Sequence, residues 1–481
     1  MTLLTENWGT LLSIGVILVE IVAIGVAIRA IMTVRTSQGA IAWAVALVSF
    51  PYLSLPLYFF FGRNRFHGYV LSRRAGDLRI HHITRELARD FPAHFRTDLT
   101  HRPSDFVALE KLAKTPFTNA NHSRLLIDGE ATFDAIFEAL DQAREYVLIQ
   151  FFIVHDDGLG QRLHRALAAC AQRGVRVYFL IDAIGSHDLP DHYAHSLREH
   201  GVQVAAFNAR SDRRSRFQIN FRNHRKIVVV DGEQAFLGGH NVGDEYLGLD
   251  RKLSPWRDTH VALRGPAVLG AQLAFMEDWH WVTGEVPTMS WEVEAPQDAN
   301  QDVLIVPTGP ADEQETGSLL FAQLINMARR RLWIVSPYFV PDQSVTAALQ
   351  LAALRGVDVR ILIPRNPDHR LVHLAAQAYF PAAIRDGIGI YRYRKGFLHQ
   401  KVALVDDEVS AIGTANLDNR SLRLNFEVTA ITVCPRFAQD VERMLEADFA
   451  LADRVTAETV SRQRLPARVA FQVARLFAPI L

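Results

Sequence analysis

The strongest constraint on the fold is a polar pattern that occurs twice in this chain of 481 residues. Within residues 223–241, and again within 398–416, the order is His-x-Lys, four apolar residues, Asp, six further residues and Gly-x-x-Asn. Chance duplication of five spaced identities is improbable, so the sequence predicts two homologous halves. The matched residues are His224, Lys226, Asp231, Gly238 and Asn241 in the first copy, and His399, Lys401, Asp406, Gly413 and Asn416 in the second.

Helix and strand patterns alternate around both copies. Residues 135–153 predict a helix that leads into a strand, and residues 319–340 repeat that order. A following strand at 173–182 is matched almost residue for residue at 355–364. Such alternation is typical of parallel βαβ units, so we expect an α/β fold with a mostly parallel sheet in each half. Two unrelated α/β domains would not explain the same polar residues on corresponding strands.

The N-terminal region contains two apolar runs. Residues 8–28 carry one charge, Glu20, and residues 40–61 carry none. A helix of either length spans about 30 Å of hydrocarbon. A signal peptide would have a basic residue before its apolar run, and none precedes the first run here. The sequence therefore predicts an N-terminal two-helix transmembrane hairpin.

The distribution of arginine predicts the orientation of this hairpin. Arg29 and Arg35 are expected in the loop between the spans, whereas a larger group follows the second span. The positive-inside rule places the larger group in the cytoplasm. We therefore expect a multi-pass protein of the inner (plasma) membrane with its remaining chain in the cytoplasm. The larger group consists of Arg63, Arg65, Arg73, Arg74 and Arg79.

The whole chain divides into four predicted segments. These are a transmembrane hairpin over residues 1–65, a juxtamembrane linker over 66–120, a first α/β half over 121–300 and a second over 301–481. Lys plus Arg and Asp plus Glu both number 52, so no overall positive field indicates nucleic-acid binding. We expect no nucleic-acid partner.

The repeated polar residues suit chemistry on a phosphate. If the halves pack about a pseudo-two-fold axis, two histidines and two lysines meet in one cleft. Lysine and asparagine donate to phosphate oxygens, while one imidazole attacks phosphorus and the other protonates the leaving oxygen. Neither step requires a metal. His369 and His373 are four residues apart but lack the glutamate of a zinc-protease motif, so we expect surface histidines, no metal and no other cofactor.

The two motifs resemble those of the phospholipase D superfamily, over residues from about 120 to the C-terminus. With the N-terminal hairpin and residues 256–268 and 419–428, the chain most resembles the bacterial cardiolipin synthases. The resemblance implies two α/β halves that share one site, and a phosphohistidine intermediate. It also implies transfer of a phosphatidyl group between two phosphatidylglycerol molecules, which yields cardiolipin and glycerol. The alternatives are a phosphodiesterase that hydrolyses phospholipids or cuts nucleic acid, and a membrane scaffold without catalysis.

The resemblance also implies roles for individual residues. The catalytic set comprises the paired motif residues, with His224 as the nucleophile and His399 as the general acid. Asn241 and Asn416 bind substrate, and Asp258 and Glu427 orient the imidazoles, each following the histidine of its own half. Asp231 and Asp406 belong to the motif, but at the far end of each strand we expect them to anchor a turn. The catalytic set by motif is His224, Lys226, Asp231, His399, Lys401 and Asp406.

One departure from the family pattern concerns the residue after the motif glycine. The second copy has Thr414 there, whereas the first has Gly239 followed by His240. The first half therefore lacks a hydroxyl donor, and His240 either replaces it as a phosphate ligand or faces solvent.

Two basic segments are candidates for lipid contact. Residues 208–226 concentrate arginine before the first motif, and we expect them to bind anionic headgroups such as those of phosphatidylglycerol. Residues 462–481 alternate arginine with apolar residues at helical spacing, which suits either a membrane surface or packing against the domain. The basic residues of the first segment are Arg210, Arg213, Arg214, Arg216, Arg222, Arg225 and Lys226.

Overall fold

The computed structural model describes residues 3–34, 36–62, 93–99, 104–207, 220–297 and 299–480. The chain forms two compact units. One comprises residues 1–68 with 210–221, and the other comprises 69–209 with 222–481.

The N-terminal unit consists of the helices α1 (Leu3–Thr33), α2 (Ser37–Ser49) and α3 (Pro51–Phe61). Residues 10–33 of α1 are long and apolar enough to cross a membrane, and α2 is a shorter apolar helix. The helices share a small core that contains Ala30, Leu47 and Tyr58. α1 and α2 therefore form a plausible hairpin.

The second predicted span differs from the structure. Residues 40–61 do not form one helix, because the chain breaks at Phe50, whose φ is −137° and ψ 60°. A residue before proline is disfavoured in the helical conformation, and Pro51 then begins α3 at a position that needs no N–H donor. The Ser54 hydroxyl donates to the Ala46 carbonyl across the break, at 2.8 Å. Arg29, expected in a loop, lies within α1.

The arginines on which the predicted orientation depends lie outside the described residues. They are Arg35, Arg63, Arg65, Arg73, Arg74 and Arg79.

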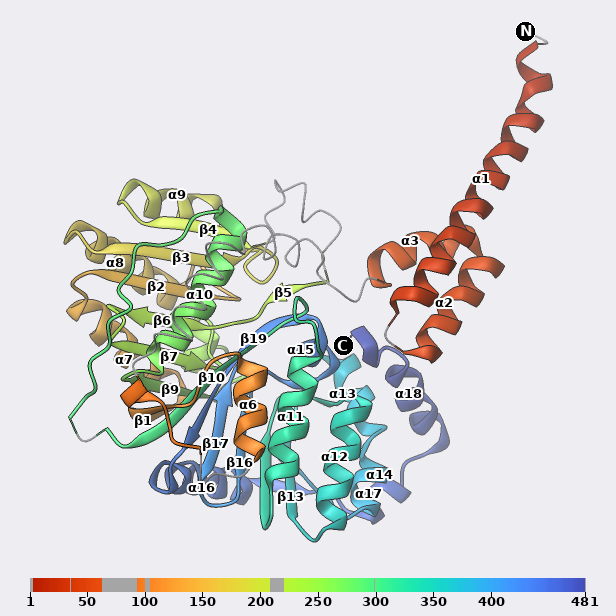
Figure 1. The fold of residues 1–481 in the computed structure, drawn as a ribbon. Coiled ribbons are helices and arrows are strands. Elements are labelled where there is room, and N and C mark those ends of the chain that lie inside the picture. Colours follow the sequence, from red (N-terminus) through yellow and green to blue (C-terminus); the bar gives the residue numbers. More distant parts are fainter. Residues whose placement is uncertain are drawn as a thin grey trace. The chain divides into compact units, whose positions relative to one another are not determined.

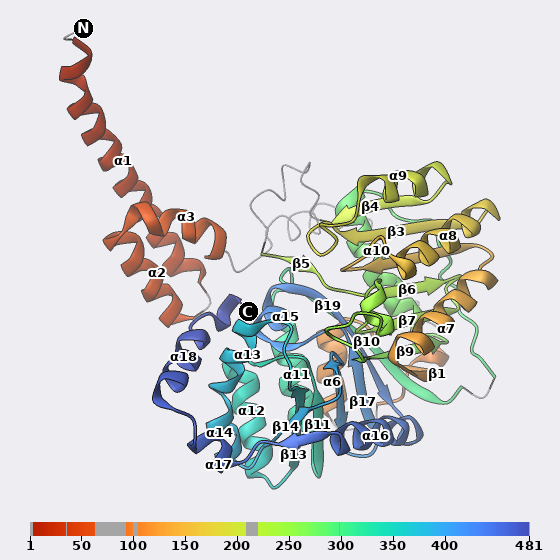
Figure 2. The ribbon, with the colours of Figure 1, turned by 180° about the vertical axis from the view of Figure 1, so that it is seen from behind.

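The larger unit contains two α/β halves that follow the same order of elements (Figures 1 and 2). It begins with the 3-10 helix η1 (Ala93–Phe95) and α6 (Ser104–Ala113). The first half contains β1 (Thr118–Ile127), α7 (Asp128–Gln142), β2 (Tyr146–Phe151), α8 (Gly158–Gln172), β3 (Arg176–Asp182), α9 (Asp191–Glu199), β4 (Gln203–Phe207), β5 (Arg222–Asn223), β6 (Ile227–Val230), β7 (Gln234–Gly238), η2 (Asp244–Leu247), β8 (Trp256–Arg257), β9 (Thr259–Arg264) and α10 (Val268–Thr283).

The second half repeats this order and ends with additional helices. It contains β10 (Gln301–Thr308), α11 (Thr316–Met327), β11 (Arg331–Val335), β12 (Phe339–Val340), α12 (Gln343–Leu354), β13 (Asp358–Pro364), α13 (Arg370–Gln377), α14 (Phe380–Arg385), β14 (Gly389–Tyr393), β15 (Phe397–Leu398), β16 (Val402–Val405), β17 (Val409–Gly413), β18 (Leu417–Asp418), α15 (Asn419–Arg423), β19 (Asn425–Val433), α16 (Pro435–Ala450), β20 (Ala452–Arg454), α17 (Ala457–Ser461), α18 (Leu465–Arg475) and η3 (Ala478–Ile480).

One large sheet passes through both halves. Its strand order is β20-β14-β13-β11-β16-β17-β19-β10-β1-β9-β7-β6-β2-β3-β4. Apart from β20, the strands of the second half, from β14 to β10, follow the same order as their counterparts in the first half, from β4 to β1. The two halves therefore meet at the antiparallel pair β1 and β10 and are related by a pseudo-two-fold axis.

The direction of the strands corrects the expectation of a mostly parallel sheet. The pairs β2–β3, β3–β4, β11–β13 and β13–β14 are parallel. The motif strands β6 and β16 run antiparallel to both of their neighbours. The reason is local, since a short turn after each motif strand returns the chain directly as β7 or β17, and an antiparallel hairpin needs no crossover helix. The sheet is mixed, and each half buries a core of its own.

Candidate active site

Each motif histidine lies just before a buried strand and is held by backbone of the other half. His224 follows β5, which pairs in parallel with β19, and its N–H donates to the Phe426 carbonyl at 2.9 Å. His399 follows β15, which pairs in parallel with β8, and its N–H donates to the Arg257 carbonyl at 2.8 Å. These short inter-half strands bring both histidines to one site.

The carboxylates cross between the halves as well. His224 Nδ1 lies 2.9 Å from Glu427 Oε2, and His399 Nδ1 lies 2.8 Å from Asp258 Oδ2. Both carboxylates are fully buried. The expectation that each carboxylate serves the histidine of its own half is therefore wrong. The inter-half strands explain this, because they place each histidine beside the strand that carries the opposite carboxylate.

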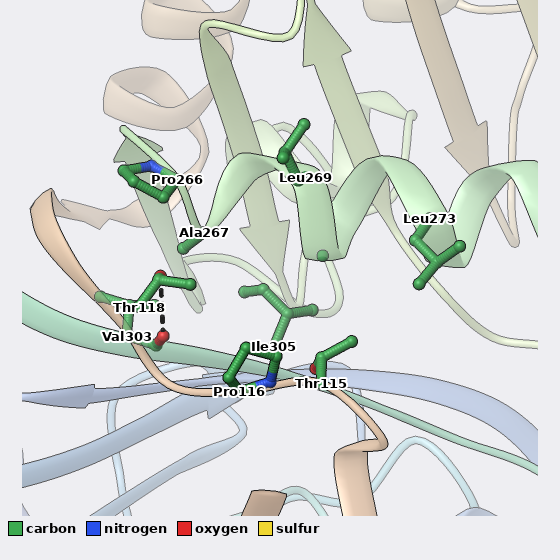
Figure 3. Close-up of a pocket in the computed structure, with 10 residues that line it drawn as sticks. Thr115, Pro116, Thr118, Pro266, Ala267, Leu269, Leu273, Val303 and Ile305 are labelled. Atoms are coloured by element: carbon green, nitrogen blue, oxygen red, sulfur yellow. Dashed lines mark hydrogen bonds between the residues drawn. The ribbon is translucent and has the colours of Figure 1, made fainter. Parts of the chain in front are cut away.

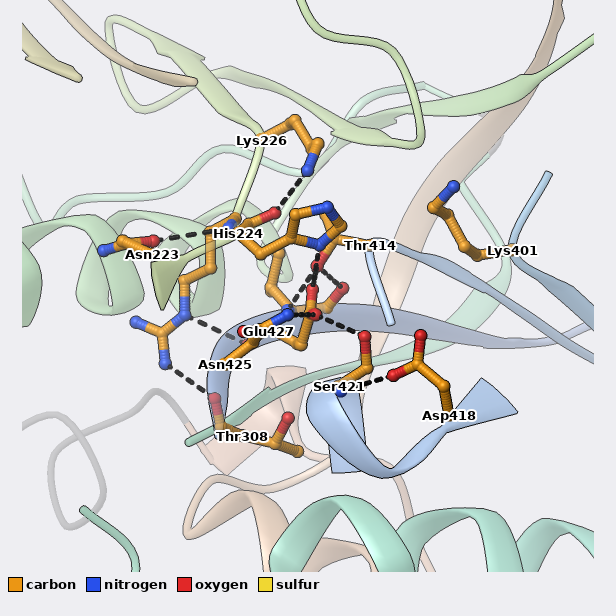
Figure 4. A network of polar contacts seen from close by, with 12 residues as sticks. Asn223, His224, Lys226, Thr308, Lys401, Thr414, Asp418, Ser421, Asn425 and Glu427 are labelled. Atoms are coloured by element: carbon orange, nitrogen blue, oxygen red, sulfur yellow. Dashed lines mark hydrogen bonds and ion pairs between the residues drawn. The ribbon is translucent and has the colours of Figure 1, made fainter. Parts of the chain in front are cut away.

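Glu427 is the centre of a polar network (Figure 4). Its Oε2 accepts the Thr414 hydroxyl at 2.6 Å, and its Oε1 accepts the Ser421 hydroxyl at 2.8 Å and the Asn425 amide at 3.2 Å. Burial raises the pKa of Glu427, but the charge and hydrogen bond of His224 outweigh burial, so the pKa is lowered from its usual value. Glu427 therefore remains a carboxylate that accepts a hydrogen bond from the Nδ1–H of His224.

The first half satisfies Asp258 without a hydroxyl side chain. Asp258 accepts the Thr259 N–H at 2.8 Å and the Trp256 indole N–H at 3.4 Å. A Cβ atom at Gly239 would lie 2.0 Å from Asp258 Oδ1. A threonine at this position would therefore collide with the carboxylate, which explains the departure from the pattern of the second half.

His240 does not face solvent, and its binding to phosphate stays a prediction. Its ring is fully buried, and its Nδ1 lies 2.9 Å from Nδ1 of His260. Burial lowers its pKa to about 3. The ring lies edge-on to Phe133, and its buried Nε2 has no hydrogen-bond partner among the described residues.

Both lysines are buried beside the histidine of their own half. Lys226 Nζ donates to the His224 carbonyl at 2.6 Å, whereas Lys401 Nζ contacts the His399 carbonyl and lies 2.9 Å from His399 Nδ1. Burial lowers the pKa of Lys226 well below its usual value and lowers that of Lys401 to about 8. Both amino groups can donate hydrogen bonds to the oxygens of a phosphate.

Burial favours the uncharged form of both histidines. Burial lowers the pKa of His224 to about 4 and lowers that of His399 well below its usual value. Each side chain is only about a tenth exposed. A neutral imidazole whose Nδ1–H faces a carboxylate carries its lone pair on Nε2, which suits nucleophilic attack or proton transfer.

The two motif asparagines are not equivalent. Asn241 accepts the Ile153 N–H at 3.1 Å and donates to the Tyr246 hydroxyl at 3.0 Å. Within the described part of the chain, the buried Oδ1 of Asn416 has no hydrogen-bond partner. Of the two motif asparagines, Asn416 is therefore the one with unused hydrogen-bonding capacity.

Asp231 and Asp406 lie outside the cluster, which corrects their place in the catalytic set. Asp231 accepts the N–H groups of residues 144–146 at 2.8–2.9 Å, and Asp406 accepts those of residues 329–331. Their φ values are 53° and 51°, in the left-handed region that aspartate tolerates in turns. Each aspartate lies seven positions after its histidine, roughly 20 Å along an extended chain.

The middle residue of each His-x-Lys motif has a role that the sequence analysis missed. Arg225 binds Asp278 at 2.9 Å and the Glu427 carbonyl at 3.0 Å, and Gln400 binds Asp448 at 2.8 Å. Both side chains are buried. The sequence did contain a signal for this role. Arg225 and Gln400 each lie beside a run of apolar residues, where a polar side chain needs a buried hydrogen-bonding partner.

This burial corrects part of the predicted lipid-binding segment. Arg225 and Lys226 are enclosed and cannot meet headgroups at a surface, and Arg222 is half-buried. The remaining arginines of the segment lie outside the described residues. They are Arg210, Arg213, Arg214 and Arg216.

A separate small cavity lies between α10 and β10 (Figure 3). Its volume is about 30 Å³, and apolar side chains such as Leu269, Leu273 and Ile305 line it. It has room for little more than one water molecule. We assign it to imperfect packing between helix and sheet. Among the described residues, no group of His, Cys, Asp or Glu is arranged to hold a metal ion.

Comparison with known proteins agrees with this geometry. The family model described as "Cardiolipin synthase, PLD-like domain" matches residues 136–253 and 321–449, one match in each half. The model described as "Phospholipase_D-nuclease N-terminal" matches residues 21–63. The fold is also that of phosphatidylserine synthase from Haemophilus influenzae, with a TM-score of 0.60, 15% identity, and coverage of 79% of this chain and 100% of that chain.

Full-length relatives define the family more narrowly. Cardiolipin synthase A of Pseudomonas aeruginosa is 52% identical over 476 residues, which cover 97% of this chain and 96% of that protein. Cardiolipin synthase A of Pseudomonas entomophila is 50% identical over 468 residues, or 96% of this chain and 97% of that protein. The chain therefore belongs to the cardiolipin synthase family of phospholipase D-like enzymes. The family resemblance and the two-half α/β fold drawn from the sequence are confirmed.

Proposed function

We propose that this enzyme makes cardiolipin and glycerol from two phosphatidylglycerol molecules through a phosphohistidine. The observation that carries the proposal is the pair of buried histidines, each fixed by a carboxylate of the other half, beside two buried lysines. Phospholipids are the substrate class that the family implies. Phosphatidylglycerol supplies both the phosphatidyl group and the accepting hydroxyl.

In the first step, His224 Nε2 attacks the phosphorus of one phosphatidylglycerol. A P–N bond forms, the P–O bond to the terminal glycerol breaks, and His399 gives its Nε2 proton to the departing oxygen. The anionic phosphate raises the pKa of His399 when it binds, which supplies the protonated general acid. Glu427 stabilises the positive charge that develops on His224.

In the second step, His399 acts as the base. It removes a proton from the glycerol hydroxyl of a second phosphatidylglycerol, whose oxygen attacks phosphorus as the P–N bond breaks. The product is cardiolipin, and His224 is again neutral. The lysines and Asn416 hold the phosphate oxygens in both steps.

One asymmetry supports His224 as the nucleophile. Among the described residues, His224 Nδ1 contacts only Glu427, whereas His399 Nδ1 lies near both Asp258 and Lys401. A single acceptor at Nδ1 fixes the tautomer with a free lone pair on Nε2. The Lys401 ammonium beside His399 instead favours transfer of a proton away from that ring.

Trapping experiments test these roles. A phosphatidyl donor with a good leaving group needs no general acid, so the His399→Ala variant should still form a covalent phosphatidyl-enzyme. The His224→Ala variant should form none. If the His224→Ala protein becomes labelled and the His399→Ala protein does not, the two roles are reversed.

Product analysis tests synthesis against hydrolysis. Purified enzyme given phosphatidylglycerol alone should yield cardiolipin and glycerol, measured by mass spectrometry. Phosphatidic acid as the only lipid product would indicate the phospholipase D-type hydrolase.

The proposal includes the arrangement in the membrane. We expect the N-terminal helices to span the inner membrane as a multi-pass anchor and the two α/β halves to lie in the cytoplasm. The apolar α1 and the matching N-terminal family model support membrane association. Cysteine labelling near residue 70 from the outer side alone would overturn this orientation. The start of β1 at Thr118 and of β10 at Gln301 supports segment boundaries near residues 120 and 300.

A further inference from the structure

The C-terminal helix α18 leaves an apolar face in solvent. It packs on α13, and its inward residue Ala474 is 3% exposed, as part of the core of the second half. Other large apolar residues of the segment recur every three or four positions, so they share one face. We call them the apolar stripe: Leu465, Val469, Val473, Leu476 and Phe477, which are 70%, 53%, 50%, 77% and 45% exposed.

A basic side borders this stripe. Arg464, Arg468 and Arg475 recur at intervals of four and seven residues, and no Asp or Glu follows Glu458 in the sequence. Within the described residues, none of these three arginines forms an ion pair. A stripe of exposed apolar residues beside uncompensated arginines complements an anionic phospholipid surface.

A second observation points to the same ligand. A cavity of about 470 Å³ lies between α12, α14 and α18, and Leu349, Ala383 and Ile388 are among its mostly apolar lining. This volume lies within the range of about 300–1,000 Å³ typical of ligand sites. Arg475 also lines the cavity, with its guanidinium carbon 5.8 Å from the centre of the Tyr379 ring. The cavity thus offers apolar walls and one cation, as an acyl chain with a phosphate headgroup requires.

We propose that the apolar stripe lies in the headgroup region of an anionic bilayer and that this cavity receives one acyl chain, with Arg475 on the lipid phosphate. The inference goes beyond the proposed reaction, because no bond changes at this site. Phe339 of β12 lines the cavity, and β12 pairs with β18 directly after Asn416. A bound lipid would therefore contact the layer behind the catalytic asparagine.

Spin labels test the position of the stripe. Because α1 would hold the chain in vesicles regardless, the depth of the label is informative and flotation is not. The full chain with Val473→Cys, in vesicles of phosphatidylcholine and phosphatidylglycerol, should be more accessible to oxygen than to a water-soluble nickel chelate. Leu354→Cys, at a leucine 72% exposed on α12, is the control and should show the reverse. The unmodified chain gives the background of its own cysteines.

Two results would overturn the stripe proposal. Strong collision of Val473→Cys with the nickel chelate would place the stripe in water. A rigid spectrum with little access to either reagent would indicate that protein covers it, either another part of this chain or a second copy.

A photoactivatable phosphatidylglycerol tests the cavity. With the reactive group near the acyl terminus, labelled peptides should include residues 343–350 and 378–388. Loss of one basic contact with an anionic headgroup weakens lipid binding about fivefold. Arg475→Gln should therefore reduce the yield of labelled peptide about fivefold. Arg464→Gln, on the same side of α18 but outside the lining, should label normally. Equal labelling by phosphatidylcholine, or none of these peptides, would refute the site. Neither test depends on turnover, so both remain valid if the proposed reaction is wrong.

Discussion

The crossed carboxylates allow a test of which half controls which chemical step. Glu427→Gln and Asp258→Asn keep the shape of each side chain and remove its charge. Glu427 contacts His224 and Asp258 contacts His399, so under the proposed roles Glu427→Gln should weaken the nucleophile and Asp258→Asn should weaken the general acid. If each carboxylate served its own half, the two effects would be exchanged.

The magnitude follows from burial. Both carboxylates are inaccessible to solvent and lie 2.8–2.9 Å from an imidazole nitrogen. Loss of a preorganised contact with charge that develops in the transition state costs about 2.7–4 kcal/mol. At about 1.4 kcal/mol per factor of ten, each variant should lose roughly two to three orders of magnitude in kcat with phosphatidylglycerol.

The assay separates the steps by choice of donor. With an activated donor that needs no general acid, Asp258→Asn should form the covalent phosphatidyl-enzyme at close to the normal rate. Glu427→Gln should remain slow with both donors. Thermal unfolding of each variant serves as the control for folding. Rapid trapping by Glu427→Gln with slow trapping by Asp258→Asn would refute the crossed assignment.

Further predictions concern pH, packing, turns and cofactors. Because burial lowers the pKa of Lys401 to about 8, its charged form prevails below that pH, so kcat/KM should fall as pH rises through about 8. Lys401→Arg should move this decline to higher pH, and an unchanged profile would exclude Lys401 as its cause. Gly239→Ala places a Cβ atom 2.0 Å from Asp258 Oδ1, so turnover should fall at least tenfold, measured with phosphatidylglycerol; normal turnover would contradict the packing. Asp231→Ala removes three backbone hydrogen bonds and should lower Tm, while the folded fraction keeps its kcat; a specific loss of kcat would return this aspartate to the site. Turnover should persist in excess chelator, because the proposed nucleophile is a histidine; complete loss of activity that one divalent ion restores would refute this.

The sequence predicted the duplication well because both halves carry the same polar residue types at the same spacing. His224 and His399 were recognisable from spacing alone, without knowledge of how the halves dock. Which carboxylate reaches which histidine was not predictable in that way. It depends on the short strands β5 and β15, whose partners are far away in sequence.

Two other predictions were wrong because the average character of a segment hid the behaviour of one residue within it. The apolar run of residues 40–61 predicted one helix, although Pro51 within it disfavours helix at Phe50. Arg225 counted as part of a charged surface because its neighbours in sequence are basic. In the fold its side chain turns inward to Asp278, a residue 53 positions later that no local pattern connects to it.

Because each motif histidine contacts a carboxylate of the other half, the proposed catalytic pairs form only when the two halves dock. Neither motif histidine has its carboxylate partner within its own half, so halves that have folded but not docked would lack both of the proposed catalytic pairs. The same property means that the two halves, expressed from separate genes, would restore activity only on meeting, and that either half could serve as bait for the other. Each half supplies one motif histidine and the carboxylate partner of the other histidine. Loss of these residues from one half would therefore affect both histidines.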